Sequence, residues 1–251
     1  MKFAFLFSCI AAIVCYCVIG LTGFGKAEKN ALRASLAFII VPSAVLSLYF
    51  FWLRPWQLSW GATEEELNRP MPGDEIVKEP AFDATRGLTV KAPPEYIWPW
   101  IVQIGFKRAG FYSYDWIDHR GIPSAERILP ELQTLQVGDE VPLSESGYVV
   151  VRTMEPNRSM MWESPDYEFT WAWGLYELDS EHTRLVTRLR ARFYPTSFGA
   201  AVFIVVFDIG DFIMMRKCML GIKRGAETGT TASFGATLPI SSRGTRMRLA
   251  P

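Results

Sequence analysis

The residues best suited to chemistry lie close together between positions 115 and 127. Asp115, Asp118 and His119 fall within five consecutive positions, and Arg127 follows eight residues later. A carboxylate that orients a histidine is a common arrangement for general-base catalysis. The sequence therefore offers Asp115, His119 and Arg127 as catalytic candidates, against a structural alternative in which Asp115 accepts a hydrogen bond inside an aromatic loop.

Other catalytic chemistry has little support in the sequence. The second histidine, His182, stands in a polar turn, where we expect it to be solvated. No cysteine occurs between positions 54 and 217, so this part of the chain has neither a cysteine-based metal site nor a disulfide framework. A metal-ligand spacing, a glycine-rich phosphate loop and a serine-nucleophile motif are also missing. We therefore expect no metal and no cofactor.

Two long apolar runs precede this region. Phe3–Phe24 contains 22 residues without a charge, and Leu36–Leu53 adds 18 more, with Pro42 inside. Each is long enough to cross a hydrocarbon core of about 30 Å at about 1.5 Å per residue. The polar stretch 26–33 between them predicts a helical hairpin, so residues 1–57 are expected to form a two-helix transmembrane anchor.

A cleaved signal peptide is the alternative for the first run. Its apolar core would be about 7–15 residues long and would end at a small-residue cleavage site. The observed run is longer and a second one follows it. Trp52, Trp56 and Trp60, together with Arg54, are typical of an anchor at the membrane surface. The basic residues place the inter-helix loop in the cytoplasm by a narrow margin, which leaves the side of the soluble domain open.

The charge balance argues against nucleic acid as a partner. The formal net charge of the 251 residues is zero, but positions 54–227 hold 19 basic and 25 acidic side chains. A phosphate backbone requires a basic surface, which this region lacks.

Residues 84–227 have the pattern of an α+β domain. Alternating residues predict a first strand at 84–92, and Pro93 and Pro94 then open a helix that reaches Ile104. Short runs with hairpin spacings predict further antiparallel strands at 148–154, 159–163, 168–178 and 184–193.

A long helix at 196–227 closes this domain. A third membrane span is its alternative, but Asp208 and Asp211 would each cost about 2.5–3.5 kcal/mol in a bilayer. The flanking segments are expected to be a linker at 58–83, with a short helix capped by Thr63 and Glu66, and a disordered tail at 228–251.

Charged side chains within these apolar elements allow two interpretations. On the last predicted strand, Arg184, Arg188, Arg190 and Arg192 share the face opposite to the leucines. We expect this row to face water, although one arginine could bind an anionic head group. Asp208 and Asp211 lie near one face of the long helix. They are expected at a solvated rim; in a cavity they would need partners and would suggest function.

Four stretches together resemble a known superfamily: Thr89-Val-Lys-Ala-Pro-Pro-Glu-Tyr-Ile-Trp-Pro-Trp-Ile-Val-Gln-Ile-Gly105, Gly110-Phe-Tyr-Ser-Tyr-Asp-Trp116, Arg127–Asp139 and Arg216–Arg224. Over residues 84–226 the chain is similar to the START, birch-pollen-allergen and polyketide-cyclase superfamily (SRPBCC), in a membrane-anchored bacterial subgroup. The resemblance implies a helix-grip fold, in which a curved antiparallel sheet wraps around a long C-terminal helix.

The function that this resemblance implies is binding of an apolar small molecule or lipid in an internal cavity, next to the membrane. Hydrophobic cavities of this kind are lined by aromatic residues with a few polar groups. The expected ligand-binding residues are Trp98, Tyr112, Tyr114, Trp116, Phe169, Trp171, Trp173, Phe207 and Asp211. A cyclase- or hydrolase-type enzyme using the same cavity and a non-catalytic membrane accessory protein are the alternatives, because the fold hosts several functions.

Overall fold

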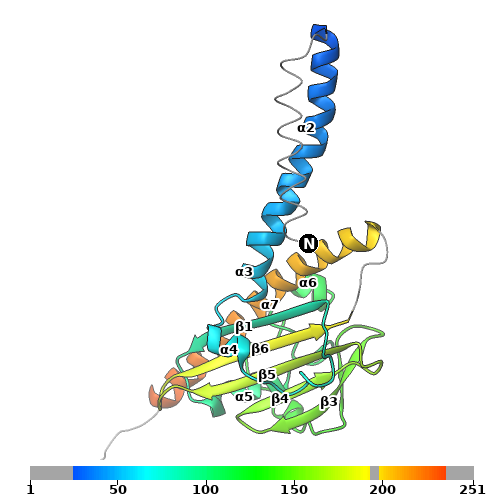
Figure 1. Cartoon of the computed structure of the whole chain (residues 1–251). Coiled ribbons are helices and arrows are strands. Elements are labelled where there is room, and N and C mark those ends of the chain that lie inside the picture. The colour runs from blue at the N-terminus through cyan, green and yellow to red at the C-terminus, as the bar shows by residue number, and fades with distance from the viewer. Residues whose placement is uncertain (1–24, 193–197, 236–251) are drawn as a thin grey trace, which may run out of the picture.

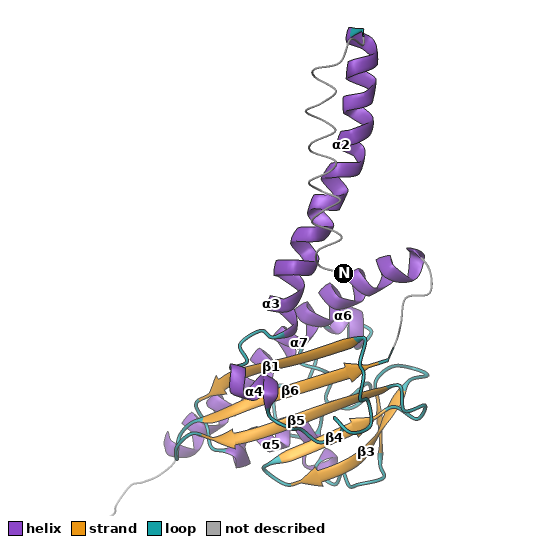
Figure 2. Cartoon of the chain, viewed as in Figure 1, coloured by secondary structure: helices purple, strands orange, loops and turns teal. Residues whose placement is uncertain are grey.

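The computed structural model describes residues 25–192 and 198–235. They form an antiparallel sheet, a long helix behind one face of that sheet, and a helical stalk that rises from the domain (Figures 1 and 2). The predicted α+β class and the arrangement of a sheet with a long C-terminal helix are confirmed.

The stalk consists of α2 (Lys26–Leu48), a π-helical turn η1 (Tyr49–Leu53) and α3 (Arg54–Leu58). In the described residues this is the one helix that is long and apolar enough to cross a membrane, with a mean hydropathy of 2.2 and very little of its surface buried. The other predicted span, Phe3–Phe24, lies outside the described residues. One of the two expected spans is therefore present as a helix. The expectation of a loop at 26–33 is wrong, because α2 already begins at Lys26.

The sheet has six antiparallel strands in the order β1-β6-β5-β4-β3-β2. The strands are β1 (Phe82–Val90), β2 (Glu140–Pro142), β3 (Tyr148–Glu155), β4 (Ser159–Glu163), β5 (Phe169–Glu177) and β6 (Thr183–Ala191). All five predicted strands are found, with ends that differ by two residues or fewer over the described part. Because β1 pairs with β6, the first and last strands meet and bring the two ends of the domain together.

Two helices pack against one face of the sheet. α5 (Pro94–Val102) and α7 (Phe198–Gly235) lie together behind β5 and β6 (Figure 2). The core between them and the sheet is aromatic: the ring of Trp162 lies 5.1 Å from that of Trp171 and 6.1 Å from that of Trp173. Met219 and Ile222 of α7 are fully buried in the same cluster. Burial of this face anchors α7 across the sheet.

The prediction of a disordered tail from residue 228 is wrong for its first part. α7 continues to Gly235, beyond the buried Ala226. The hydroxyl of Thr228 also donates a hydrogen bond back to the carbonyl of Arg224. Residues 236–251 lie outside the described part.

The predicted linker is part of the domain. Residues 61–81, which we call the outer segment, cover the sheet face opposite to α7 (Figure 1). The segment includes α4 (Glu64–Asn68), whose predicted capping box between Thr63 and Glu66 is confirmed. Met71 packs against Met161, Ala172 and Val186 of the sheet.

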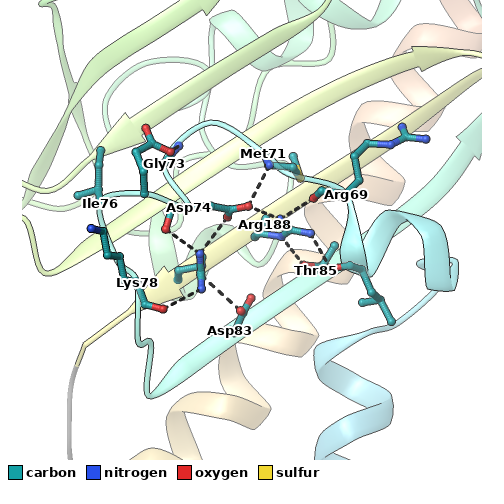
Figure 3. Close-up of polar contacts among 12 residues, drawn as sticks. Arg69, Met71, Gly73, Asp74, Ile76, Lys78, Asp83, Thr85 and Arg188 are labelled. Carbon is teal, nitrogen blue, oxygen red and sulfur yellow. Dashed lines mark hydrogen bonds and ion pairs between the residues drawn. The ribbon is translucent and has the colours of Figure 1, made fainter.

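The expectation that the arginine row of β6 faces water is wrong, because the outer segment covers it. Arg188 lies 2.7 Å from the carboxylate of Asp74, and it donates hydrogen bonds to the backbone oxygens of Arg69, Glu66 and Leu67. Figure 3 shows Asp74 at the centre of this contact. Arg190 also pairs with Asp74, at 3.2 Å. These arginines hold the outer segment on the sheet.

Candidate ligand-binding cavity

A cavity of about 480 Å³ lies between the sheet and the first half of α7. Its size is within the usual range for small-molecule sites, about 300–1,000 Å³. Most of its wall is apolar. The lining residues are Phe111, Ser113, Asp118, Leu143, Phe169, Trp171, Leu189, Ala191, Phe207, Gly210, Asp211, Met214, Met215 and Cys218.

Strands β5 and β6, helix α7 and the segment around α6 supply this wall, for reasons visible in the sequence. β5 and β6 alternate, so that Phe169 and Trp171 point toward α7 while the residues between them point toward the outer segment. On α7, Phe207, Gly210 and Asp211 share the side that faces the sheet. The short helix α6 (Asp115–Asp118) and the loop before it close the remaining side.

Asp118 is a half-buried residue of this wall, and both oxygens of its carboxyl group are buried. Neither of its oxygens has a hydrogen-bond partner among the described residues. The neighbouring hydroxyl of Ser113 donates to the backbone oxygen of Met214, at 3.1 Å, and its proximity to Asp118 acts to lower the pKa of that carboxyl group. Burial, followed by the charge of Asp115, raises the pKa of Asp118 to about 6. The group is therefore close to its titration point at neutral pH and is available to a polar atom of a ligand.

Asp211 is the second carboxyl group in the wall, and it has a partner. Nη1 of Arg86 lies 2.7 Å from Oδ2 of Asp211, while Nε of Arg86 donates to the backbone oxygen of Gln57 at 2.9 Å. Burial raises the pKa of Asp211, and the charge of Arg86 opposes that rise. The ion pair fixes the position of a carboxylate that would otherwise be costly in this setting.

Asp208 lies one turn earlier on α7 and is fully buried. It accepts a hydrogen bond from the hydroxyl of Tyr49, at 3.0 Å, and pairs with Arg54. The expectation that Asp208 and Asp211 face a solvated rim is wrong, because residues of the stalk and of β1 cover both of them.

The three catalytic candidates do not form one site. His119 is buried, with Nδ1 2.8 Å from the carbonyl of Ile122 and Nε2 accepting from the backbone N–H of Lys107 at 3.2 Å. Both ring nitrogens are thus occupied by structural bonds, which leaves none for a substrate. Asp115 accepts a hydrogen bond from the hydroxyl of Ser124, as the structural alternative expects.

Asp115 and Arg127 line a different hollow from the cavity. This second hollow, of about 770 Å³, lies between α5, the loop around residues 112–128 and the second half of α7. Lys217 and Arg224 also border it, so its wall is strongly charged. Its wall is more polar than that of the cavity.

The expected ligand-binding residues divide into two groups. Phe169, Trp171, Phe207 and Asp211 line the cavity. Five others do not: Trp98 and Trp173 are packed in the core, Tyr112 and Tyr114 lie on the far side of the loop, and Trp116 is exposed to solvent.

The hydroxyl of Tyr112 has structural partners. It accepts from the side-chain amide of Gln103 at 2.8 Å and donates to the carbonyl of Trp100 at 3.1 Å. Burial raises the pKa of this phenol. Tyr112 therefore holds the loop against α5.

The sequence did not single out Asp118, which lines the cavity, or Arg86, which pairs with the cavity residue Asp211. Arg86 lies on the same face of β1 as Leu88 and Val90. A buried cation on an apolar face requires an acidic partner nearby. Asp211, an acid on an apolar helix, was its available partner. Asp118 gave no comparable pattern, since its position depends on how α6 meets α7.

Comparisons with known proteins leave the family open. No protein-family model matches the chain, and no curated protein matches its sequence. A polyketide-cyclase-like protein of Corynebacterium glutamicum is similar in structure, at 16% identity over 60% of this chain and 94% of its own, with a TM-score of 0.40. A protein of Thermus thermophilus aligns at 14% identity over 59% of this chain and 99% of its own, with a TM-score of 0.38.

A protein of Bacillus halodurans gives a similar result, with 12% identity, coverage of 58% of this chain and 96% of its own, and a TM-score of 0.39. Likenesses of this strength carry no function from these proteins to the present chain.

Proposed function

We propose that this protein is anchored in a membrane by its N-terminal helical segment and binds an apolar small molecule or a lipid in the cavity between the sheet and α7. The observation that carries this proposal is the cavity itself: about 480 Å³ of space with a wall made largely of aromatic and aliphatic side chains. An empty apolar cavity of this size forfeits packing energy, which a ligand would restore.

The membrane part of the proposal rests on the stalk. Lys26–Leu58 has the length and composition of a span, and large apolar side chains such as Phe38, Leu48 and Trp52 are exposed along it. Exposure of such residues in water is unfavourable, and a bilayer would remove it.

The cavity can be tested by filling it. A Cβ added at Gly210, in the cavity wall, would meet no atom within 4 Å, so Gly210→Leu should place its side chain in the empty space. Gly229→Leu is the matched control, because it makes the same substitution on the same helix, away from the cavity, where a Cβ also has room. The readout is the midpoint of thermal unfolding of the full chain in uncharged detergent, with and without a lipid extract of the host membrane.

We expect the extract to raise the midpoint for the parent chain and for Gly229→Leu, but not for Gly210→Leu. An equal rise in all three proteins would place the ligand elsewhere. No rise in any of them would favour the accessory protein without a ligand.

An enzyme that uses the same cavity is the second candidate, and the state of Asp118 favours it. A carboxyl group with a pKa near 6 in an apolar wall is suited to general acid–base catalysis. This places the catalytic role on Asp118, in contrast to Asp115 and His119. In any turnover found with a screened substrate, Asp118→Asn should abolish activity and Asp115→Asn should retain it.

A further inference from the structure

The first half of α7 has two apolar sides. One side lines the cavity, through Phe207, Gly210, Asp211 and Met214. A neighbouring, outward side carries Val206, Ile209 and Ile213, which are 63%, 37% and 44% exposed. Their spacing of three and four residues places them in a single stripe along the helix. A soluble helix would carry polar residues at such positions.

From residue 216 onward, the exposed side chains of this stripe are cationic and no longer apolar. Arg216 and Lys217 continue it and are exposed, and Arg224 follows two turns later. The apolar half is the half that lies against the stalk, because Tyr49 bonds to Asp208 and the ring of Trp56 lies 5.2 Å from that of Phe212. The cationic half runs away from the stalk (Figure 1). Among the described exposed side chains of α7, those beside the stalk are therefore apolar and those that follow, as far as Arg224, are cationic.

A second element adds apolar surface beside this half of α7. Trp116 and Ile117 of α6 are 76% and 51% exposed. α6 is held next to α7, since Ser113 bonds to the backbone of Met214 and the ammonium of Lys217 lies 3.9 Å from the ring centre of Tyr114. Figure 1 places α6 beside α7, near the base of the stalk.

We propose that Val206, Ile209 and Ile213 of α7, with Trp116 and Ile117 of α6, form a membrane-docking patch that lies in the head-group region of the bilayer crossed by the stalk. This proposal rests on the membrane anchoring proposed above. A bilayer is the occupant that fits, because Phe212 on this part of α7 contacts Trp56 of the stalk, so the patch lies beside the exposed apolar surface of the stalk. Tryptophan is favoured at that depth, and the cations that follow the patch would meet lipid phosphates.

The docking patch has a consequence for the cavity. The segments that carry the patch also supply Asp118, Phe207 and Asp211 to the cavity wall. The wall formed by α6 and α7 is therefore the one nearest to the bilayer, and an apolar ligand could pass through it with little exposure to water.

The test is a measurement of depth with spin labels on the full chain. In a background where Cys9, Cys15, Cys17 and Cys218 are replaced by alanine, single labels are attached at Trp116→Cys and Ile209→Cys. Phe38→Cys, on the stalk and 81% exposed, reports the span. Leu178→Cys, in the turn between β5 and β6 and 58% exposed, is the matched control away from the patch.

The protein is reconstituted in vesicles of equimolar phosphatidylcholine and phosphatidylglycerol, and collisions of each label with oxygen and with a water-soluble nickel chelate are compared. We expect the labels at 116 and 209 to show severalfold fewer nickel collisions than the label at 178, with a depth between those at 38 and 178. If Trp116→Cys fails to fold, Ile117→Cys provides the same readout.

Two results would overturn the proposal in distinguishable ways. Labels at 116 and 209 as accessible to nickel as the label at 178, with 38 protected, would remove the docking patch and leave the anchor in place. A label at 38 that is also open to nickel would remove the proposed membrane anchor together with the patch.

Discussion

Two carboxyl groups enter the wall of an otherwise apolar cavity, and they differ in what surrounds them. Asp211 faces Arg86, whereas both oxygens of Asp118 lie without a hydrogen-bond partner in the described part of the chain. A buried acid with a partner retains its charge more easily than one without. Asp118 is therefore the residue at which a change of pH, or a ligand with a hydrogen-bond donor, should have the largest effect.

The first prediction concerns the pH dependence of stability. The pKa of Asp118 is about 6 in the fold, against an ordinary value of 3.8. The folded state holds the proton of Asp118 more tightly than the unfolded chain does. The stability that this protonated carboxyl group contributes is therefore fully present below the ordinary pKa, and it is lost as the pH rises through the folded pKa. Asp118→Asn replaces the ionising group, so this variant does not lose stability as the pH rises. At neutral pH it should be more stable than the parent chain by about 1 kcal/mol, a value that is reduced because the carboxyl group is partly exposed.

Thermal unfolding of the full chain in uncharged detergent, above and below the pKa of Asp118, measures this difference. The gain should disappear at the lower pH. Asp115→Asn is the control, because it loses the bond from Ser124 and should gain nothing at either pH. A difference between parent and Asp118→Asn that does not vary with pH would contradict the assignment.

At the scale of elements, the sheet is covered on both faces. α7 and α5 cover one face, and the outer segment covers the other through the arginines of β6. Glu66 is central to this contact, since its carboxylate lies 2.7 Å from Arg184. Although burial would raise the pKa of Glu66, hydrogen bonds from Arg184 and Thr63 keep it below its usual value. The outer segment is thus fastened by ion pairs that water reaches poorly.

The second prediction compares two adjacent glutamates of α4. Glu66→Gln leaves Arg184 without its charged partner and should lower the free energy of unfolding by about 2 kcal/mol. Glu65→Gln removes only an exposed pair with Arg69, and should change it by less than about 0.5 kcal/mol. Chemical denaturation of both variants, with hydrogen exchange of residues 61–81, measures the effect. Equal losses, or unchanged exchange in Glu66→Gln, would show that the pair does not hold the segment.

The elements were more predictable than their contacts. Period-two patterns located the strands, because each side chain must face either the helices or the outer segment. The partners of the β6 arginines could not be predicted in this way. Arg188 meets Asp74 more than a hundred positions away, and the proline-rich sequence around Asp74 resembles a linker in isolation. A row of four arginines on one strand was still a sign that carboxylates had to lie opposite.

In the candidate site, too, some residues could be predicted from the sequence and others could not. Phe169, Trp171 and Phe207 were predictable as cavity residues because strand and helix periodicity assigns them to inner faces. Trp98 and Trp173 have equally apolar patterns and lie in the core, since periodicity separates inside from outside but not core from cavity. Asp118 and the ion pair of Arg86 with Asp211 depend on the packing of α6 and β1 against α7.

For the whole molecule, the stalk and the cavity are joined by polar contacts at one end of α7. Arg54 and Tyr49 of the stalk bind Asp208, and the backbone of Gln57 binds Arg86, which in turn pairs with the cavity residue Asp211. Breaking such a buried network is unfavourable, so the stalk is expected to keep a fixed orientation on the domain. The proposed function depends on this fixed orientation of the stalk, because the orientation places the cavity next to the membrane.

The most direct test of the central claim is native mass spectrometry of the full chain, extracted from its own membrane in uncharged detergent with minimal washing. We expect a co-purifying apolar molecule on the parent chain, retained in Gly229→Leu and lost in Gly210→Leu. A protein that carries no such molecule and takes up none from a lipid extract, or one that retains it equally in Gly210→Leu, would contradict the account.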